Sequence, residues 1–262
     1  MARATAGGGG VSGILAGVVE EARRVVEEAG RAGVGLRVLG GVAIRLRAGD
    51  RLHPAFRREY ADLDFVAPRG SSAEVQRFFE EQGYVPQVRF NTLYGKERLL
   101  FFDEANERQV DVLVGDFRMC HRIPLGDRLA LEPLTIPLAE LLLTKLQIVE
   151  LNEKDVRDAL ALLHAHEVAE EDGDRINAAR IAELCAADWG LWRTFTANLG
   201  ALGGHLGRYG LSAEDERLVR GRVGALQERI EREPKPLAWR LRDKIGDRKR
   251  WYELPEEVAG GP

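Results

Sequence analysis

Apolar residues recur at helical spacing near the start of the chain and in short strand-like runs after it. Between Leu15 and Ala29 they fall every three or four positions, which predicts a helix capped by Ser12 and ended by Gly30. Apolar runs bounded by turn residues predict strands over 36–39, 62–66, 84–90, 98–102 and 109–114. Two more helices are expected between the first three strands, over 42–46 and 73–82.

The pattern changes at Pro137, a residue suited to the first position of a helix. Beyond it only helical periodicity remains, over 138–151, 152–166, 175–186, 191–199, 213–232 and 237–245, with a flexible connection at the glycine-rich stretch 200–210. The expected fold class is α+β (α/β), a mixed β-sheet with flanking helices followed by an all-helical C-terminal domain. We place a disordered leader at 1–10, the α/β domain at 11–136 and the helical domain at 137–262.

Composition and charge narrow the class of protein. The 262 residues carry 38 Lys and Arg against 42 Asp and Glu, which excludes a uniformly cationic nucleic-acid coat and leaves a local basic patch open. No apolar run approaches the roughly 18 residues of a membrane span, and the glycine-rich start lacks the apolar stretch of a secretory signal. The two cysteines exclude a disulfide framework. We therefore expect a cytoplasmic protein without a membrane partner.

Three aspartates stand on predicted strands that are otherwise apolar. Asp62 and Asp64 flank one apolar residue, so their side chains point the same way, about 6–7 Å apart along the strand. Asp111 interrupts the apolar run Val110–Val114, where an unpaired carboxylate is costly to desolvate. If the two strands are neighbours, the acids converge and repel one another unless a cation shares the site, and all-oxygen ligation favours Mg²⁺ or Mn²⁺. Taken singly, Asp62 and Asp64 are typical of a solvated strand face, and Asp111 of a core acid paired with an arginine.

Two glycines precede these acids. Gly40 and Gly41 lie between a predicted strand and a predicted helix, where backbone N–H groups can meet phosphate oxygens and the missing Cβ atoms let a triphosphate approach. Alone, such a pair is more often a simple turn. Together with the acids, in this order along the chain, the glycines indicate phosphoryl-type transfer, in which divalent ions clamp the attacking and leaving oxygens.

The order Gly40-Gly41, then the pair Asp62 and Asp64, then Asp111 on a later strand resembles the DNA polymerase β-type nucleotidyltransferase superfamily, over about residues 36–160. The closest likeness is to its abortive-infection toxin and aminoglycoside-modifying branches. The resemblance implies two Mg²⁺ ions and transfer of a nucleoside monophosphate from an NTP to an acceptor hydroxyl. It also implies that Asp62 and Asp64 hold both metals, and that Asp111 holds the catalytic metal and helps to deprotonate the acceptor.

Two cations are candidates for contact with the triphosphate. Lys145 interrupts an apolar helix, and in the resembling branch a lysine at the matching position contacts the triphosphate. The alternative for Lys145 is a side chain that reaches the surface. Arg58 stands four residues before Asp62, as is frequent in that branch, and either neutralises phosphate charge or lies in an exposed loop. Asp155 and Asp158 share one helix face and either position Lys145 or an arginine, or are simply exposed.

The sequence thus predicts an enzyme, a metal-dependent nucleotidyltransferase with an NTP as co-substrate. The acceptor is open between RNA such as tRNA, a protein and a small molecule such as an aminoglycoside antibiotic. For the toxin branch, a neutralising partner protein is a further candidate partner. Val42 follows the glycines where many family members have Ser or Thr, which keeps a catalytically inert nucleotide-binding or interaction module as an alternative. The basic and aromatic segment 235–252 suits either RNA binding or docking of its tryptophans on the helical half.

Overall fold

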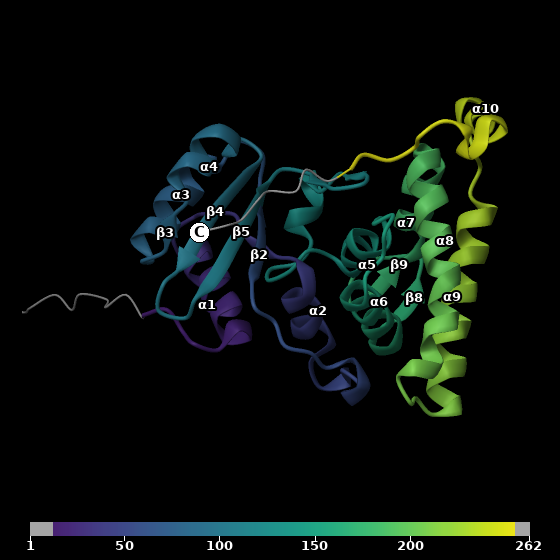
Figure 1. The fold of residues 1–262 in the computed structure, drawn as a ribbon, viewed down its shortest axis with the longest axis horizontal. Helices are drawn as coiled ribbons and strands as arrows, with labels where there is room; N and C mark the ends of the chain where they lie inside the picture. Colours follow the sequence, from purple (N-terminus) through teal and green to yellow (C-terminus); the bar gives the residue numbers. More distant parts are fainter. Residues whose placement is uncertain (1–12, 255–262) are drawn as a thin grey trace, which may run out of the picture.

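A computed structural model describes residues 13–254, and Figure 1 shows their course. The first half of the described chain forms an α/β part and the second half a largely helical part. The α/β part contains α1 (Val18–Arg31), β1 (Arg37–Val38), α2 (Gly40–Ala48), β2 (Leu63–Ala67), α3 (Ser72–Glu81), β3 (Val85–Pro86), α4 (Val88–Tyr94), β4 (Arg98–Asp103), β5 (Arg108–Val114), β6 (Phe117–Arg118) and β7 (Arg122–Ile123). Short 3₁₀ turns lie at Gly49–Arg51, Pro54–Phe56 and Gly126–Ala130.

The central element is a mixed sheet with the strand order β1-β2-β5-β4-β3. Strands β2 and β5 run parallel, and the other neighbouring pairs run antiparallel. In the parallel pair, Leu63 lies opposite Val110, and Asp64 lies opposite Asp111. The apolar residues that alternate with the aspartates fix this register, because a shift by one residue would turn acids toward the core.

Helix α3 covers one face of the sheet through aromatic side chains. Phe79 of α3 stacks on Phe101 of β4, with 4.7 Å between ring centroids, and lies 5.8 Å from the ring of Phe65 of β2. All three rings are almost fully buried. Because side chains alternate along a strand, Asp64 and Asp111 point to the opposite face of the sheet from this aromatic cluster.

The prediction of a strand over 84–90 is wrong for most of that range. Only Val85–Pro86 pair with β4, and the chain then turns into helix α4. The contacts of Leu100 explain the early end of the strand. Gln87 N makes the last ladder bond, to Leu100 O at 2.9 Å. The side chain of Asn91 then donates to Leu100 O at 3.1 Å and accepts from Leu100 N at 2.8 Å, where a continued strand would pair its own backbone.

The helical part packs against the α/β part and shares its core, since buried apolar residues from both parts form one continuous cluster. Its elements are α5 (Leu138–Leu146), α6 (Glu153–Ala165), β8 (Glu167–Ala169), β9 (Arg175–Asn177), α7 (Ala178–Ala187), α8 (Trp189–His205), α9 (Ala213–Arg232) and α10 (Leu237–Ile245), with 3₁₀ turns at Leu206–Arg208 and Gly246–Arg248. The expected α+β class, a mixed sheet followed by a helical C-terminal part, is confirmed. The expectation that this part is all helical needs one correction, because β8 and β9 form a small parallel sheet.

Three other expectations about helices need correction. The stretch from Gly200 to His205 is not a connection but the last part of α8, because Leu199 and Leu202 are fully buried and their packing outweighs the low helix propensity of glycine. Helix α1 begins at Val18 with Gly17 as its N-cap, and the expected cap Ser12 lies outside the described residues, as does the expected leader. Helix α5 stops at Leu146, five residues earlier than expected. None of the helices within residues 13–254 is both long enough and apolar enough to span a bilayer.

The basic segment after α9 docks its tryptophans on the helical part. The indole N–H of Trp239 donates to Cys185 O at 3.0 Å, and that of Trp251 donates to Thr194 Oγ1 at 3.0 Å. The chain then returns to the turn between β6 and β7, where Glu253 N donates to Cys120 O at 3.0 Å (Figure 1). These contacts favour the docking interpretation of this segment over RNA binding.

The aromatic cluster provides a test of the fold. We expect Phe79→Ala to lower the free energy of unfolding by about 3–5 kcal/mol, because it leaves a cavity among rings that cannot collapse. Phe102→Ala is the matched control: this phenylalanine is 39% exposed on β4, and its loss should cost less than about 1 kcal/mol. Urea denaturation of both variants measures the difference, and equal losses would contradict the packing described here.

Candidate active site

Two of the three predicted acids lie side by side on adjacent strands. Asp64 of β2 and Asp111 of β5 are register partners in the parallel pair, so their side chains leave the same face of the sheet. Asp111 is buried, with 9% of its surface exposed, and Asp64 is partly buried. Asp62 precedes β2 and is exposed, at the open edge of the same face. The structure therefore pairs two of these acids closely and leaves the third at the rim.

The electrostatics of Asp64 reflect this proximity. The pKa of Asp64 is raised to about 6, chiefly by burial and then by the charge of Asp111, with a smaller rise from Asp62, whereas Lys145 and Arg98 lower it. A carboxyl with such a pKa is partly protonated just below neutrality. Burial and the neighbouring acid both disfavour the charged form of this carboxyl, and a bound cation would favour it.

The two glycines approach the acids without side chains of their own. Gly40 adopts a φ of +71°, and a Cβ there would overlap Asp64 Oδ2 and lie 3.1 Å from Asp64 Cγ. A Cβ at Gly41 would overlap the guanidinium of Arg58, 2.9 Å from its Cζ. Helix α2 begins at these glycines, and no side chain caps its first turn. The N-terminal N–H groups of α2 therefore lie beside the acids, where the helix dipole favours an anion.

An arginine that the sequence analysis did not single out completes the acid pair. Arg98 of β4 donates from Nε to both carboxylate oxygens of Asp111, at 2.9 Å each, and its Nη2 also bonds Oδ2. The alternative interpretation of Asp111, an acid paired with an arginine, is therefore realised, but the pair faces Asp64 rather than pointing away from it. Arg98 precedes Leu100, the register partner of Asp111, by two residues on the same strand. The strand pairing, once known, would have identified it.

The remaining cations are held by two acids of α6. Lys145 Nζ lies 3.1 Å from Asp155 Oδ1 and 2.9 Å from Asp158 Oδ2. Arg58 forms a two-pronged ion pair with Asp158, at 2.9 Å from Nε and 2.8 Å from Nη2. Burial alone would raise the pKa of Asp158, but Arg58 and Lys145 lower it below its usual range. Of the two interpretations given above for these acids, the structure shows the one in which they position the cations.

Tyr60 lies within this cation cluster. The guanidinium of Arg58 stacks over the Tyr60 ring at 4.5 Å from its centroid, beside the start of α2. Burial raises the pKa of Tyr60, and the charge of Asp158 adds to that rise. The tyrosine therefore stays a neutral hydroxyl at physiological pH and contributes a polar tip and a ring face to the site.

The acids have the right chemistry for a divalent cation, but they are not arranged as a complete set of metal ligands. Carboxylate oxygens are the ligands that Mg²⁺ and Mn²⁺ prefer. Among residues 13–254, however, no three His, Cys, Asp or Glu side chains are arranged to share one ion. The reason is visible in the contacts: Asp111 is engaged by Arg98, and Asp62 stands at the exposed rim.

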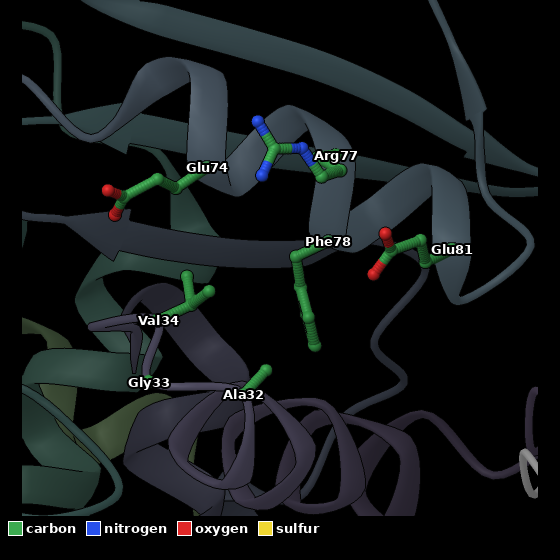
Figure 2. A pocket seen from close by; sticks show the side chains of 7 residues that line it. All are labelled: Ala32, Gly33, Val34, Glu74, Arg77, Phe78 and Glu81. Atoms are coloured by element: carbon green, nitrogen blue, oxygen red, sulfur yellow. The ribbon is translucent and has the colours of Figure 1, made fainter.

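Other features of the surface do not contribute to this site. A hollow of about 360 Å³ lies between the end of α1 and helix α3, lined by Ala32, Gly33, Val34, Glu74, Arg77, Phe78 and Glu81 (Figure 2). None of its lining residues belongs to the acid pair or the cation cluster.

The raised pKa of Asp64 predicts an effect on stability. The folded protein holds the Asp64 proton more tightly than the unfolded chain, so stability falls as pH rises from about 4 to about 6 and stays lower above that. Asp64→Asn should therefore raise the free energy of unfolding of the metal-free protein at pH 7 by about 1–3 kcal/mol.

The measurement is thermal or urea unfolding of both proteins in a chelating buffer between pH 4 and pH 8. The difference between variant and wild type should grow across the window from pH 4 to pH 6 and then level off. A variant that is less stable than wild type at pH 7 would contradict the environment described for Asp64.

The close approach at Gly40 gives another prediction. Gly40→Ala places a Cβ in a left-handed conformation and against Asp64, so it should lower the free energy of unfolding by about 2 kcal/mol or more. Gly221→Ala is the matched control, because nothing lies within 4 Å of a Cβ at that position of α9. It should stabilise the protein by up to about 1 kcal/mol. Thermal unfolding of the two variants should show shifts of opposite sign.

The sequence matches no model of a protein family and no curated protein. Solved structures that it resembles include the antibiotic-resistance factor ANT(2'')-Ia, 15% identical with a TM-score of 0.42 over 71% of this chain and 97% of that one. An antigenic nucleotidyltransferase-like protein from Paracoccidioides brasiliensis is 12% identical, with a TM-score of 0.39 over 84% of this chain and 95% of that one. The STING-associated CdnE c-di-GMP synthase from Capnocytophaga granulosa is 10% identical, with a TM-score of 0.28 over 85% and 84%.

Proposed function

We propose that the protein is a metal-dependent nucleotidyltransferase, which moves a nucleoside monophosphate from an NTP to an acceptor hydroxyl. The observation that carries the proposal is the pairing of Asp64 with Asp111 beneath the glycine start of α2. The paired acids favour a bound cation, whereas the N-terminus of α2 favours a bound anion. A divalent ion with a triphosphate satisfies both.

The acids have separate roles in this proposal. Asp62 and Asp64 would hold both divalent ions, and Asp111 would also hold the catalytic ion and help to take the proton of the acceptor hydroxyl. The ions, Mg²⁺ or Mn²⁺, would neutralise phosphate charge and polarise the α-phosphate. The acceptor oxygen then bonds to the α-phosphorus, the bond to the β-phosphate oxygen breaks, and pyrophosphate leaves.

The glycines and cations bind the triphosphate in this proposal. The N–H groups of Gly40 and Gly41 donate to phosphate oxygens, which a side chain at either position would exclude. Lys145 and Arg58 supply positive charge from the other side. Because Asp158 holds both cations in place before any ligand arrives, their ordering does not have to occur on binding.

Transfer of label from an NTP tests the proposal. Purified protein is incubated with each NTP labelled at the α-phosphate and with Mg²⁺ or Mn²⁺, in separate reactions with cell RNA, cell protein and an aminoglycoside mixture. We expect label to enter one acceptor class only, and loss of transfer by at least about 100-fold in Asp64→Asn and Asp111→Asn.

Exposed Asp127 lies in a turn outside the site and supplies the matched control, since Asp127→Asn removes the same charge and should leave transfer unchanged. Transfer that survives both site substitutions would refute the assignment of the acids. Binding of NTP without transfer to any acceptor would support the inert module instead.

A further inference from the structure

Three cations lie around the acid pair and the glycine start of α2, and they differ in what holds them. Lys145 and Arg58 are held by the α6 acids Asp155 and Asp158, outside the pair. Arg98, in contrast, has its ion pair with Asp111, one of the acids that the proposed function assigns to metal binding. Arg98 therefore already neutralises the charge of Asp111 in the protein without a metal.

The contact between Arg98 and Asp111 occupies both oxygens of the carboxylate. Nε of Arg98 lies 2.9 Å from Oδ1 and 2.9 Å from Oδ2, and Nη2 adds a further bond to Oδ2. These bonds take up much of the acceptor capacity of the carboxylate, and the guanidinium charge repels a divalent ion that approaches it. The charge of Arg98 also reaches Asp64, whose pKa it lowers.

Arg98 has more room to move than the other cations. Its side chain is 34% exposed, against 13% for Lys145 and 15% for Arg58. Its guanidinium carbon lies 5.9 Å from the centroid of the Phe90 ring on α4, an aromatic face on which an arginine can rest when displaced. The other two cations are enclosed by their α6 partners.

We propose that Arg98 is a resident counter-cation that competes with the divalent ion for Asp111 and must be displaced before that ion binds fully. In the metal-free protein, Arg98 neutralises Asp111 and lowers the repulsion between the two acids. When a divalent ion arrives, the guanidinium withdraws toward Phe90. This inference rests on the proposed function, because it assumes that the acids bind a metal, and it adds a control on metal loading that the function itself does not require.

Binding of Mn²⁺ alone, without nucleotide, tests this control. Free Mn²⁺ is counted by electron paramagnetic resonance during titration of wild type, Arg98→Gln and Arg98→Lys. We expect Arg98→Gln to bind Mn²⁺ at least about tenfold more tightly than wild type, because the competing charge and its bonds are gone. Arg98→Lys keeps the charge but loses the two-pronged geometry, so its affinity should fall between the two.

The matched control is Arg69→Gln, which removes the same charge from an exposed arginine paired with Asp116, outside the acid pair. It should leave the Mn²⁺ affinity unchanged. If Arg98→Gln fails to fold, as judged by circular dichroism, the comparison of Arg98→Lys with wild type carries the test. Affinities for Mn²⁺ in the foldable Arg98 variants that equal or fall below the wild-type value would overturn the inference.

Asp64→Asn separates this inference from the proposed function. If that variant loses Mn²⁺ binding while the Arg98 variants show no gain, the metal site stands and only the competition fails. If Asp64→Asn binds Mn²⁺ as wild type does, the metal site itself is refuted, and the inference falls with it.

Discussion

The parallel pairing of β2 with β5 brings two carboxylates together on one face of a sheet, and the surroundings of the pair follow from the need to balance them. Asp64 and Asp111 are partners in register, so neither can move away without loss of the strand pairing. Two negative charges on neighbouring, partly buried carboxylates repel each other, which raises the free energy of the state in which both are ionised. The fold answers with a guanidinium on Asp111, a helix N-terminus above Asp64, and two cations nearby.

The cations near the pair also join the two parts of the molecule. Arg58 comes from the loop before β2, whereas Asp158 comes from α6 of the helical part. Both side chains are largely buried, and so is Lys145, which shares Asp158. Removing one partner from such a buried ion pair leaves an uncompensated charge, which is strongly destabilising. The geometry of the site is therefore coupled to the packing of the helical part.

Much of this arrangement could be predicted from the sequence, because the strands around the acids have strong apolar alternation. The strands that carry Asp64 and Asp111, and the helix that starts at Gly40, were all expected close to their observed positions. The side-chain contacts between residues far apart in the sequence could not be predicted in this way. The contact of Arg98 with Asp111 depends on the pairing of β4 with β5, and that of Arg58 with Asp158 on the packing of α6 against a loop. Local patterns also failed where tertiary contacts decide, as for the glycines of α8 and the turn after Pro86.

The return of the chain to Cys120 has a consequence for how the protein is made. The backbone N–H of Glu253 donates to Cys120 O in the hairpin of β6 and β7, a segment that is translated much earlier. Just before it, the indole N–H of Trp251 donates to Thr194 Oγ1. Domains fold largely from the N-terminus onward during synthesis. In a nascent polypeptide, the contact of Glu253 with Cys120 can therefore form only after the tryptophan segment has left the ribosome, well after the β6–β7 hairpin has been made.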